Sequence, residues 1–530
     1  MEALDWLVIG VFFLALIGII VWVVRQKQND SADYFLGGRD ATWLAIGASI
    51  FASNIGSEHL IGLAGAGASS GMAMAHWEIQ GWMILILGWV FVPFYTRSMV
   101  YTMPEFLERR YNPQSRTILS VISLVSYVLT KVAVTVYAGG LVFQQVFGIK
   151  ELWGIDFFWI AAIGLVVLTA LYTIFGGMKS VLYTSVLQTP ILLLGSLIIL
   201  VLGFKELGGW DEMMRVCGAV TVNDYGDTMT NLIRSNDDAN FPWLGALIGS
   251  AIIGFWYWCT DQFIVQRVLS GKNEMEARRG TIFGAYLKLL PVFLFLIPGM
   301  IAFALHQKYI GAGGEGFLPM LANGTANADA AFPTLVAKLL PAGVKGLVVC
   351  GILAALMSSL ASLFNSSAML FTIDFYKRFK PETPEKKLVG IGQIATIVIV
   401  VLGILWIPIM RSVGDVLYTY LQDVQSVLAP GIAAAFLLGI CWKRTSAQGG
   451  MWGLISGMVI GLTRLGAKVY YSNAGEVADS TFKYLFYDMN WLFFCGWMFL
   501  FCIIVVIVVS LATEAPVSYT HLRAHETDSY

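Results

Sequence analysis

Long apolar runs separated by short polar loops dominate the pattern of hydrophobic and polar positions along this chain. About 20 consecutive apolar residues form a helix long enough to cross the hydrocarbon core of a bilayer. The pattern therefore predicts about 13 membrane-spanning helices, over residues 5–25, 41–69, 72–96, 117–147, 155–175, 178–204, 242–266, 280–306, 344–376, 388–410, 413–440, 447–470 and 489–513.

The composition supports a polytopic all-α membrane protein. Hydrophobic residues make up 57% of the chain and charged residues only 13%, against a usual charged share of about 25%. The formal net charge of -1 and the scattered Lys and Arg residues leave no footprint for nucleic acid. The six cysteines lie far apart, without the spacing of a zinc or redox motif. We find no nucleotide-binding loop and no nucleophile with its base, so we do not expect an enzyme.

The loops carry an orientation signal. Lys and Arg gather in alternate loops, for example at residues 97–116, 267–279 and 377–387. By the positive-inside rule these loops are cytoplasmic. We therefore expect a multi-pass protein of the plasma (inner) membrane with its N-terminus outside. The two longest loops, near 205–240 and 308–342, then lie outside, with room for short surface helices.

The stretch 44–70, which covers most of the second predicted span, carries polar side chains that a lipid-facing helix would not tolerate, among them Asn54, Glu58 and His59. Gly56 lies near its centre, and an unwound turn at membrane depth persists only where protein or a water-filled cavity satisfies its backbone. Discontinuous helices of this kind form substrate and ion sites in secondary transporters. We expect such a site here, although the glycines alone also fit a buried helix packed through small residues.

A carboxylate and an amine lie within two other predicted spans. Glu78 falls in residues 72–96, and Lys288, interpreted as the only lysine deep inside its helix, falls in residues 280–306. A charge at membrane depth costs at least a few kcal/mol on insertion scales, so it needs a partner. We expect the two side chains to share one cavity and to bind hydroxyl groups of a polyhydroxylated solute. A purely structural ion pair is the alternative.

Aromatic and amide side chains suggest further contacts with such a solute. The run 254–267 places Tyr257 and Trp258 beside Asp261, which favours a second discontinuous helix. Either ring could stack on the apolar face of a sugar, although an interfacial aromatic belt gives the same pattern. Gln422 lies at membrane depth, where its amide can both donate to and accept from a hydroxyl.

A run of hydroxyl side chains lies in the span 344–376. Most serines in membrane helices bond to their own carbonyls or pack helices. A Ser358–Ser359 pair opposite an unwound turn over residues 52–56 would be different. Free carbonyls and two hydroxyls form a small all-oxygen cage that suits a hard monovalent cation without a carboxylate.

Three of these motifs resemble those of one known family. ASNIGSEHLIGLAG (52–65), WYWCTDQFIVQR (256–267) and MSSLASLFNSSAMLFTIDFY (357–376) are similar to sequences of the sodium/solute symporter family, and within it of the sodium/glucose cotransporters. The resemblance covers the chain up to about residue 513. It implies a leucine-transporter-type fold of two inverted five-helix repeats, about 41–204 and 242–440, with one extra N-terminal helix and additional C-terminal helices.

The resemblance also implies which residues bind each ligand. The sodium site would consist of the backbone carbonyls of Ala52, Ile55 and Ala355 with the hydroxyls of Ser358 and Ser359. The sugar would be held by a second set of side chains, namely Asn54, His59, Glu78, Lys288 and Gln422, with Tyr257 capping it from the cytoplasmic side and Trp258 behind. In the bacterial galactose transporter of this family a serine stands at the position of Gly81 and an asparagine at that of Gly254, so the identity of the sugar stays open.

The leading functional hypothesis is sodium-coupled secondary active import of a neutral sugar, glucose or galactose first, by alternating access. A sodium-coupled inositol or polyol symporter is the alternative within transport, and a non-coupled sugar sensor or channel on the same scaffold is the alternative outside it. Sodium is co-transported, and we expect no organic cofactor. We also predict one sodium per sugar. In family members that move two sodium ions, the second cation site resembles a cluster with an aspartate and a threonine. The matching positions in this chain are Ser185 and Ala361, which supply no carboxylate.

The last residues differ in texture from the rest. After Ala515 the chain reads PVSYTHLRAHETDSY, which resembles a translated cloning adapter. We expect residues 1–513 to form the symporter domain and 514–530 to be a non-native tail.

Overall fold

The computed structural model shows an all-helical protein and describes residues 1–530 apart from 27–29, 57, 322–323, 414–416, 474–477 and 517–530. The side chains of 129–130, 409–423 and 473 also lie outside the description. Most of the expected tail therefore lies outside the described residues, and so does the side chain of Gln422.

Nine helices among the described residues are long and apolar enough to cross a membrane. They are Ala3–Val24, Glu58–Ser98, Phe157–Leu207, Trp243–Thr260, Glu274–Gly311, Val344–Phe379, Glu385–Pro408, Val424–Cys441 and Trp491–Ala512. The number is below the predicted 13 partly because α11 (Phe157–Leu207) contains two predicted spans. Gly177 separates them with a φ of 53°, a left-handed conformation that glycine adopts at little cost.

Two predicted spans break where polar residues interrupt them, as the sequence indicates. The first comprises α3 (Trp43–Asn54) and, after a gap, the π-helical η2 (Glu58–Leu63) with α4 (Ala64–Ser70). The second comprises α13 (Trp243–Gly254), the π-helical η6 (Phe255–Thr260) and, beyond the extended Asp261, α14 (Gln262–Leu269). Each break leaves backbone groups at a helix end free for other partners.

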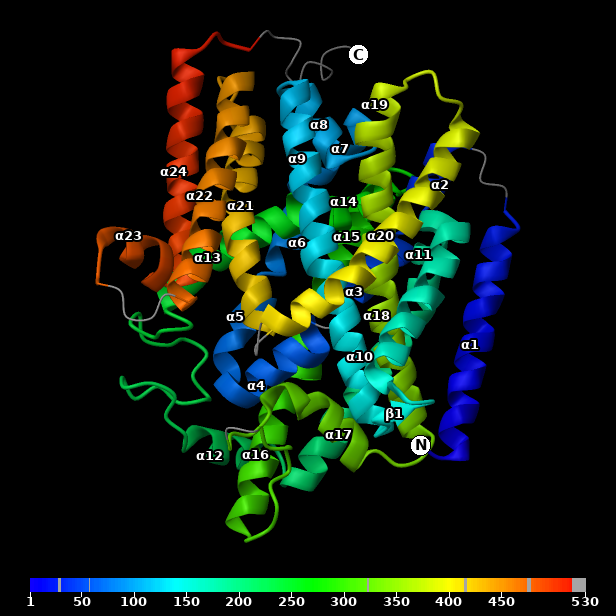
Figure 1. The fold of residues 1–530 in the computed structure, drawn as a ribbon, viewed down its shortest axis with the longest axis vertical. Helices are drawn as coiled ribbons and strands as arrows, with labels where there is room; N and C mark the ends of the chain where they lie inside the picture. Colours follow the sequence, from blue (N-terminus) through cyan, green and yellow to red (C-terminus); the bar gives the residue numbers. More distant parts are fainter. Residues whose placement is uncertain (27–29, 57, 322–323, 414–416, 474–477, 517–530) are drawn as a thin grey trace.

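The remaining spans follow the predicted boundaries closely. They are α1 (Ala3–Val24); α5 (Ala75–Ile79), α6 (Trp82–Ile86), η4 (Leu87–Phe91) and α7 (Val92–Ser98); α9 (Pro113–Ser126), η5 (Tyr127–Val132) and α10 (Ala133–Phe147); α15 (Glu274–Leu287), η7 (Val292–Leu296) and α16 (Ile297–Gly311); α18 (Val344–Met369), η9 (Leu370–Tyr376) and α19 (Lys377–Phe379); α20 (Glu385–Val413), α21 (Leu417–Cys441), α22 (Ala447–Asn473) and α24 (Trp491–Ala512). In Figure 1, α1 lies at one edge of the bundle, and α22 and α24 lie side by side at the other.

Short elements occupy the loops. They are α2 (Ser31–Leu36), η1 (Gly37–Arg39), η3 (Gly71–Met74), α8 (Met103–Arg110), β1 (Glu151–Leu152), β2 (Ile155–Asp156), α12 (Trp210–Gly218), η8 (Ala328–Ala330), α17 (Ala331–Leu339), α23 (Thr481–Lys483) and η10 (Tyr484–Asp488). Helices α12 and α17 confirm the short surface helices expected in the two longest loops. Both lie at the same end of the molecule as the N-terminus, whereas α8 and α19 lie at the opposite end (Figure 1). The orientation of these ends in a membrane stays a prediction.

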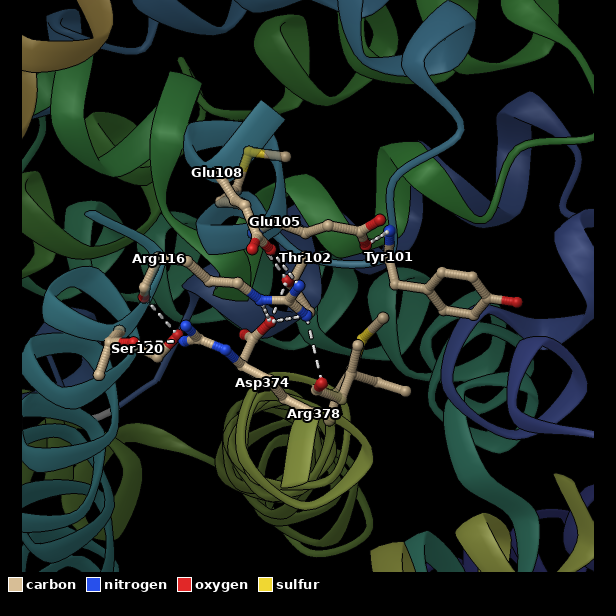
Figure 2. A network of polar contacts seen from close by, with 12 residues as sticks. Tyr101, Thr102, Glu105, Glu108, Arg116, Ser120, Asp374 and Arg378 are labelled. Atoms are coloured by element: carbon tan, nitrogen blue, oxygen red, sulfur yellow. Dashed lines mark hydrogen bonds and ion pairs between the residues drawn. The ribbon is translucent and has the colours of Figure 1, made fainter. Parts of the chain in front are cut away.

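A network of polar contacts joins the start of α9 to η9 (Figure 2). Arg116 Nε donates to Asp374 Oδ1 at 2.7 Å, and its Nη1 lies 2.5 Å from Glu108 Oε2. Thr102 Oγ1 donates to the same Asp374 oxygen at 2.8 Å. The network fixes α8 and α9 against η9, far along the chain.

Candidate functional site

The break after α3 brings its last turn against the serine pair of α18. Ser359 Oγ donates to the carbonyl of Ser53 at 2.7 Å. Ser53 Oγ lies 3.3 Å from Ser358 Oγ and 2.8 Å from Ser362 Oγ. A Cβ added at Gly56 would lie 2.8 Å from Ser359 Oγ, so only glycine allows α18 to approach this closely. The elements that carry the five predicted sodium ligands therefore meet, and all five residues are buried.

The predicted carboxylate and amine also meet. Lys288 Nζ lies 2.6 Å from Glu78 Oε2 and 2.7 Å from His59 Nε2, and His59 Nε2 lies 3.2 Å from Glu78 Oε1. All three side chains are buried. Because an ammonium only donates, the Lys288 contact makes His59 Nε2 an acceptor, so a neutral imidazole carries its proton on Nδ1.

Three buried polar atoms of this cluster make no hydrogen bond within the described part of the chain. They are Asn54 Oδ1, His59 Nδ1 and Glu78 Oε2. The last already has Lys288 Nζ as its ion-pair partner at 2.6 Å, and a carboxylate oxygen has a second lone pair with which it can accept from a ligand. Buried groups of this kind call for a partner. A ligand with both donor and acceptor groups, such as a hydroxyl compound, could satisfy all three.

A small cavity of about 20 Å³, which has room for about one water molecule, lies beside these atoms. It is lined by Asn54, Glu58, His59, Trp77, Gln80, Ile253, Tyr257, Trp258, Lys288 and Gln425. Five of the seven predicted substrate residues therefore line one cavity, and a sixth, Glu78, contacts two of them. The seventh, Gln422, has no described side chain, while Gln425 on the same helix reaches the cavity.

The aromatic residues of η6 close one side of the cavity. Asn54 Nδ2 donates to Tyr257 Oη at 2.9 Å, which links the two broken helices directly. The ring of Trp258 packs edge-on against that of Tyr257, with centroids 4.9 Å apart, and Lys288 Nζ lies 5.6 Å from the Trp258 ring. These contacts show that the aromatic run faces the protein interior and is not an interfacial belt.

A second buried ion pair lies on the other side of Tyr257. Lys131 Nζ contacts Asp261 Oδ2 at 2.8 Å and lies 4.5 Å from the centroid of the Tyr257 ring. Lys131 is buried within η5, so the interpretation of Lys288 as the only lysine deep inside a helix is wrong. The signal was present, because Lys131 lies in the middle of the predicted span 117–147.

The two glycine departures have a spatial reason. A Cβ added at Gly81 would lie 2.8 Å from Lys288 Cγ, and one added at Gly254 would lie 2.6 Å from Gln80 Oε1. Each glycine thus makes room for a polar side chain of the cavity. Glu58, Gln80 and Gln425 are cavity residues that the sequence did not assign. Glu58 is adjacent to His59 and Gln80 lies two residues after Glu78, and this closeness along the chain was the available signal.

Comparisons with known proteins show the family of the chain. The model of the sodium:solute symporter family matches residues 34–457. The mouse protein "Sodium/myo-inositol cotransporter 2" is 37% identical over 530 residues, which cover 97% of this chain and 78% of that protein. The sheep protein "Sodium/glucose cotransporter 1" is 37% identical over 540 residues, which cover 98% and 80%.

Solved structures share the fold. A Na⁺-coupled sialic acid symporter, in a substrate-bound outward-open state, superposes with a TM-score of 0.78 at 22% identity and covers 97% of this chain and 99% of its own. MhsT in complex with L-phenylalanine superposes with a TM-score of 0.51 at 12% identity, over 90% and 99%. These structural similarities confirm the predicted leucine-transporter-type fold. They do not identify the solute.

Proposed function

The chain belongs to the sodium:solute symporter family, and from that premise we propose that it imports a neutral sugar together with sodium across the plasma membrane, with its N-terminus outside. Its family and the relatives above are transporters, and sodium is the coupling ion. Glucose and galactose are the first candidates for the solute.

One observation carries the proposal for a hydroxyl-rich solute. The unsatisfied atoms Asn54 Oδ1 and His59 Nδ1 lie in one buried cluster with Glu78, beside the cavity. A sugar hydroxyl can donate to Asn54 Oδ1 or to the free lone pair of Glu78 Oε2 and accept from His59 Nδ1, whereas an apolar solute would leave Asn54 Oδ1 and His59 Nδ1 unpaired at a cost of about 1–3 kcal/mol each. Lys288 keeps Glu78 ionised and can donate to a further hydroxyl.

The remaining residues have proposed roles in closure. Tyr257 lies between the cavity and the Lys131–Asp261 pair, so its movement would open the cavity toward that side. Trp258 packs behind it. Gln422 is proposed as an additional amide contact. Stacking of either ring on the apolar face of a sugar is compatible with a buried aromatic wall.

Sodium would bind between α18 and the break that separates α3 from η2. The carbonyls of Ala52, Ile55 and Ala355 and the hydroxyls of Ser358 and Ser359 provide five oxygens, a set suited to a hard monovalent cation. The contact from Ser359 to the Ser53 carbonyl supports this assignment, because it shows that α18 reaches the last turn of α3. A cation at this position would hold the break in one shape and so favour solute binding.

myo-Inositol is a second candidate. Relatives of nearly equal identity are cotransporters of inositol and of glucose, and Glu58, Gln80 and Gln425 add polar groups around the cavity. The test is uptake into proteoliposomes under an imposed sodium gradient, screened over hexoses, inositol and amino acids. Accumulation of an amino acid in place of any hydroxyl compound would refute the proposal.

A further inference from the structure

The turn between α5 and α6 directs a glutamine side chain toward the cavity. Gly81 N donates to the carbonyl of Glu78 at 3.0 Å. Met83 N donates to the carbonyl of Gln80 at 2.9 Å. Both bonds span three residues, as in a 3₁₀ helix, where residues three apart face the same side. Trp77 and Gln80 are three apart, and both line the cavity.

The amide of Gln80 is buried and has no protein partner. The residue is 6% exposed, and its side chain makes no hydrogen bond with any residue that the structure describes. Buried polar groups in proteins are normally paired, so this amide calls for a partner. Its oxygen accepts and its nitrogen donates, so it can pair with two neighbouring hydroxyl groups at once.

Gly254 provides the room for this side chain. A Cβ added at Gly254 would lie 2.6 Å from Gln80 Oε1 and 3.4 Å from Gln80 Cβ. The shorter distance is well inside van der Waals contact, so any other residue at position 254 would displace the amide. The backbone does not require a glycine here, because its φ of -61° is ordinary for a helix. Glycine within a helix is less stable than alanine, which makes the space for Gln80 the physical reason for it.

The cavity beside the amide fits a hydroxyl group. Its volume of about 20 Å³ has room for about one water molecule, and a hydroxyl occupies a similar space. The charged groups of the neighbouring cluster each act in one direction only, because Glu78 accepts and Lys288 donates. Gln80 adds a group that does both, from the helix that also carries Glu78.

We propose that Gln80 is a specificity-determining residue of the solute site. Its amide accepts from one hydroxyl of the solute and donates to the neighbouring hydroxyl, in the space that Gly254 leaves open. The inference rests on the proposed function, since it takes a hydroxyl-rich solute as the ligand. It narrows the class of solute to compounds with two adjacent hydroxyls on the side that faces α5 and α13.

The first experiment replaces Gln80 with methionine, which has a similar length and no amide. We measure sodium-dependent binding of radiolabelled glucose, galactose and myo-inositol to the purified full chain, and check folding by thermal melting. Affinity should fall roughly tenfold. Gln145→Met, at an exposed position of α10, is the matched control and should leave affinity unchanged. Unchanged affinity in folded Gln80→Met would overturn the proposal.

Deoxy analogues of the bound solute separate a direct contact from a structural effect. In the unmodified protein, removal of either contacted hydroxyl should weaken competition with the radiolabelled solute roughly tenfold. In Gln80→Met the same removal should have little further effect, because the contact is already lost. If each analogue loses affinity by the same factor in both proteins, Gln80 has only a structural role and the proposal is overturned.

Gly254→Ala tests the assignment of the space. Alone, it should lower solute affinity about as much as Gln80→Met does, because it displaces the amide. In a Gln80→Ala background it should have no further effect, since the alanine at position 80 leaves the space free. Equal losses in both backgrounds would overturn the proposal.

These outcomes distinguish the inference from the function on which it rests. If the unmodified protein binds none of the three solutes in sodium, the proposed function fails and the inference fails with it. If the unmodified protein binds a solute and the variants at positions 80 and 254 bind it equally well, only the inference fails.

Discussion

Replacing Lys288 with alanine tests the ion pair at the centre of the proposed solute site. The substitution leaves Glu78 buried, and His59 Nε2, 3.2 Å away, can donate to it once the imidazole proton moves from Nδ1 to Nε2. Removing one partner of a buried pair costs about 3–5 kcal/mol. Because His59 retains a contact, we expect the lower half of that range. That cost lowers the free energy of unfolding, whereas the solute loses one charged donor worth about 1.5–3 kcal/mol, so solute affinity falls roughly ten- to a hundred-fold.

The assay is sodium-driven uptake in proteoliposomes at matched protein density, with folding checked by thermal melting. Lys205→Ala, on an exposed part of α11, is the control and should behave like the unmodified protein. Glu78→Ala should fail as Lys288→Ala does, since it leaves Lys288 with His59 alone at 2.7 Å.

The double variant Glu78→Ala/Lys288→Ala separates binding from structure. Removing both charges leaves no unpaired charge, so the melting temperature should recover. Uptake should stay absent, because both solute contacts are missing. Recovery of uptake in the double variant would show that the pair only holds helices together, and near-normal uptake in either single variant would remove that residue from the site.

Three further predictions concern the ion sites and the Tyr257 wall. Ser359→Ala removes a proposed sodium ligand, so the half-saturating sodium concentration should rise by about tenfold; an unchanged sodium dependence of uptake would place the ion elsewhere. Lys131→Met leaves Asp261 unpaired and should lower the Tm, with recovery in Lys131→Met/Asp261→Asn; a Tm equal to that of the unmodified protein would refute a structural role for this pair. The reversal potential of sugar-coupled current should give one charge per sugar, since Ser185 supplies no carboxylate to a second sodium; a ratio of two would contradict it.

Much of the fold could be predicted from the sequence because membrane spans are local. The length of an apolar run fixes where a helix lies, so the predicted ends agree with the structure to within a few residues over most of the chain. The break near Gly56 was also predictable, because polar residues surround a glycine at membrane depth. The break between the predicted spans 155–175 and 178–204 also agrees with the structure, because Gly177 has non-helical backbone angles that separate the two halves of α11.

The site was predictable only as a set of residues. Glu78 and Lys288 are isolated charges in apolar runs, which is enough to pair them. His59 reaches the Glu78–Lys288 pair because of the direction that η2 takes after the break, and no local sequence pattern indicates that direction. Lys131 was missed although it lies in a predicted span, because its partner Asp261 stands 130 residues away and the aromatic rings around it come from another helix.

The most direct test of the account is solute uptake by the purified chain in proteoliposomes, with an inward sodium gradient compared with equal sodium on both sides and with potassium in place of sodium. The account predicts that glucose, galactose or myo-inositol accumulates above the external concentration only with the inward sodium gradient, and that accumulation collapses when a sodium ionophore removes the gradient. Equal uptake with and without the gradient, or no uptake of any of these hydroxyl compounds by folded protein, would contradict sodium-coupled sugar import.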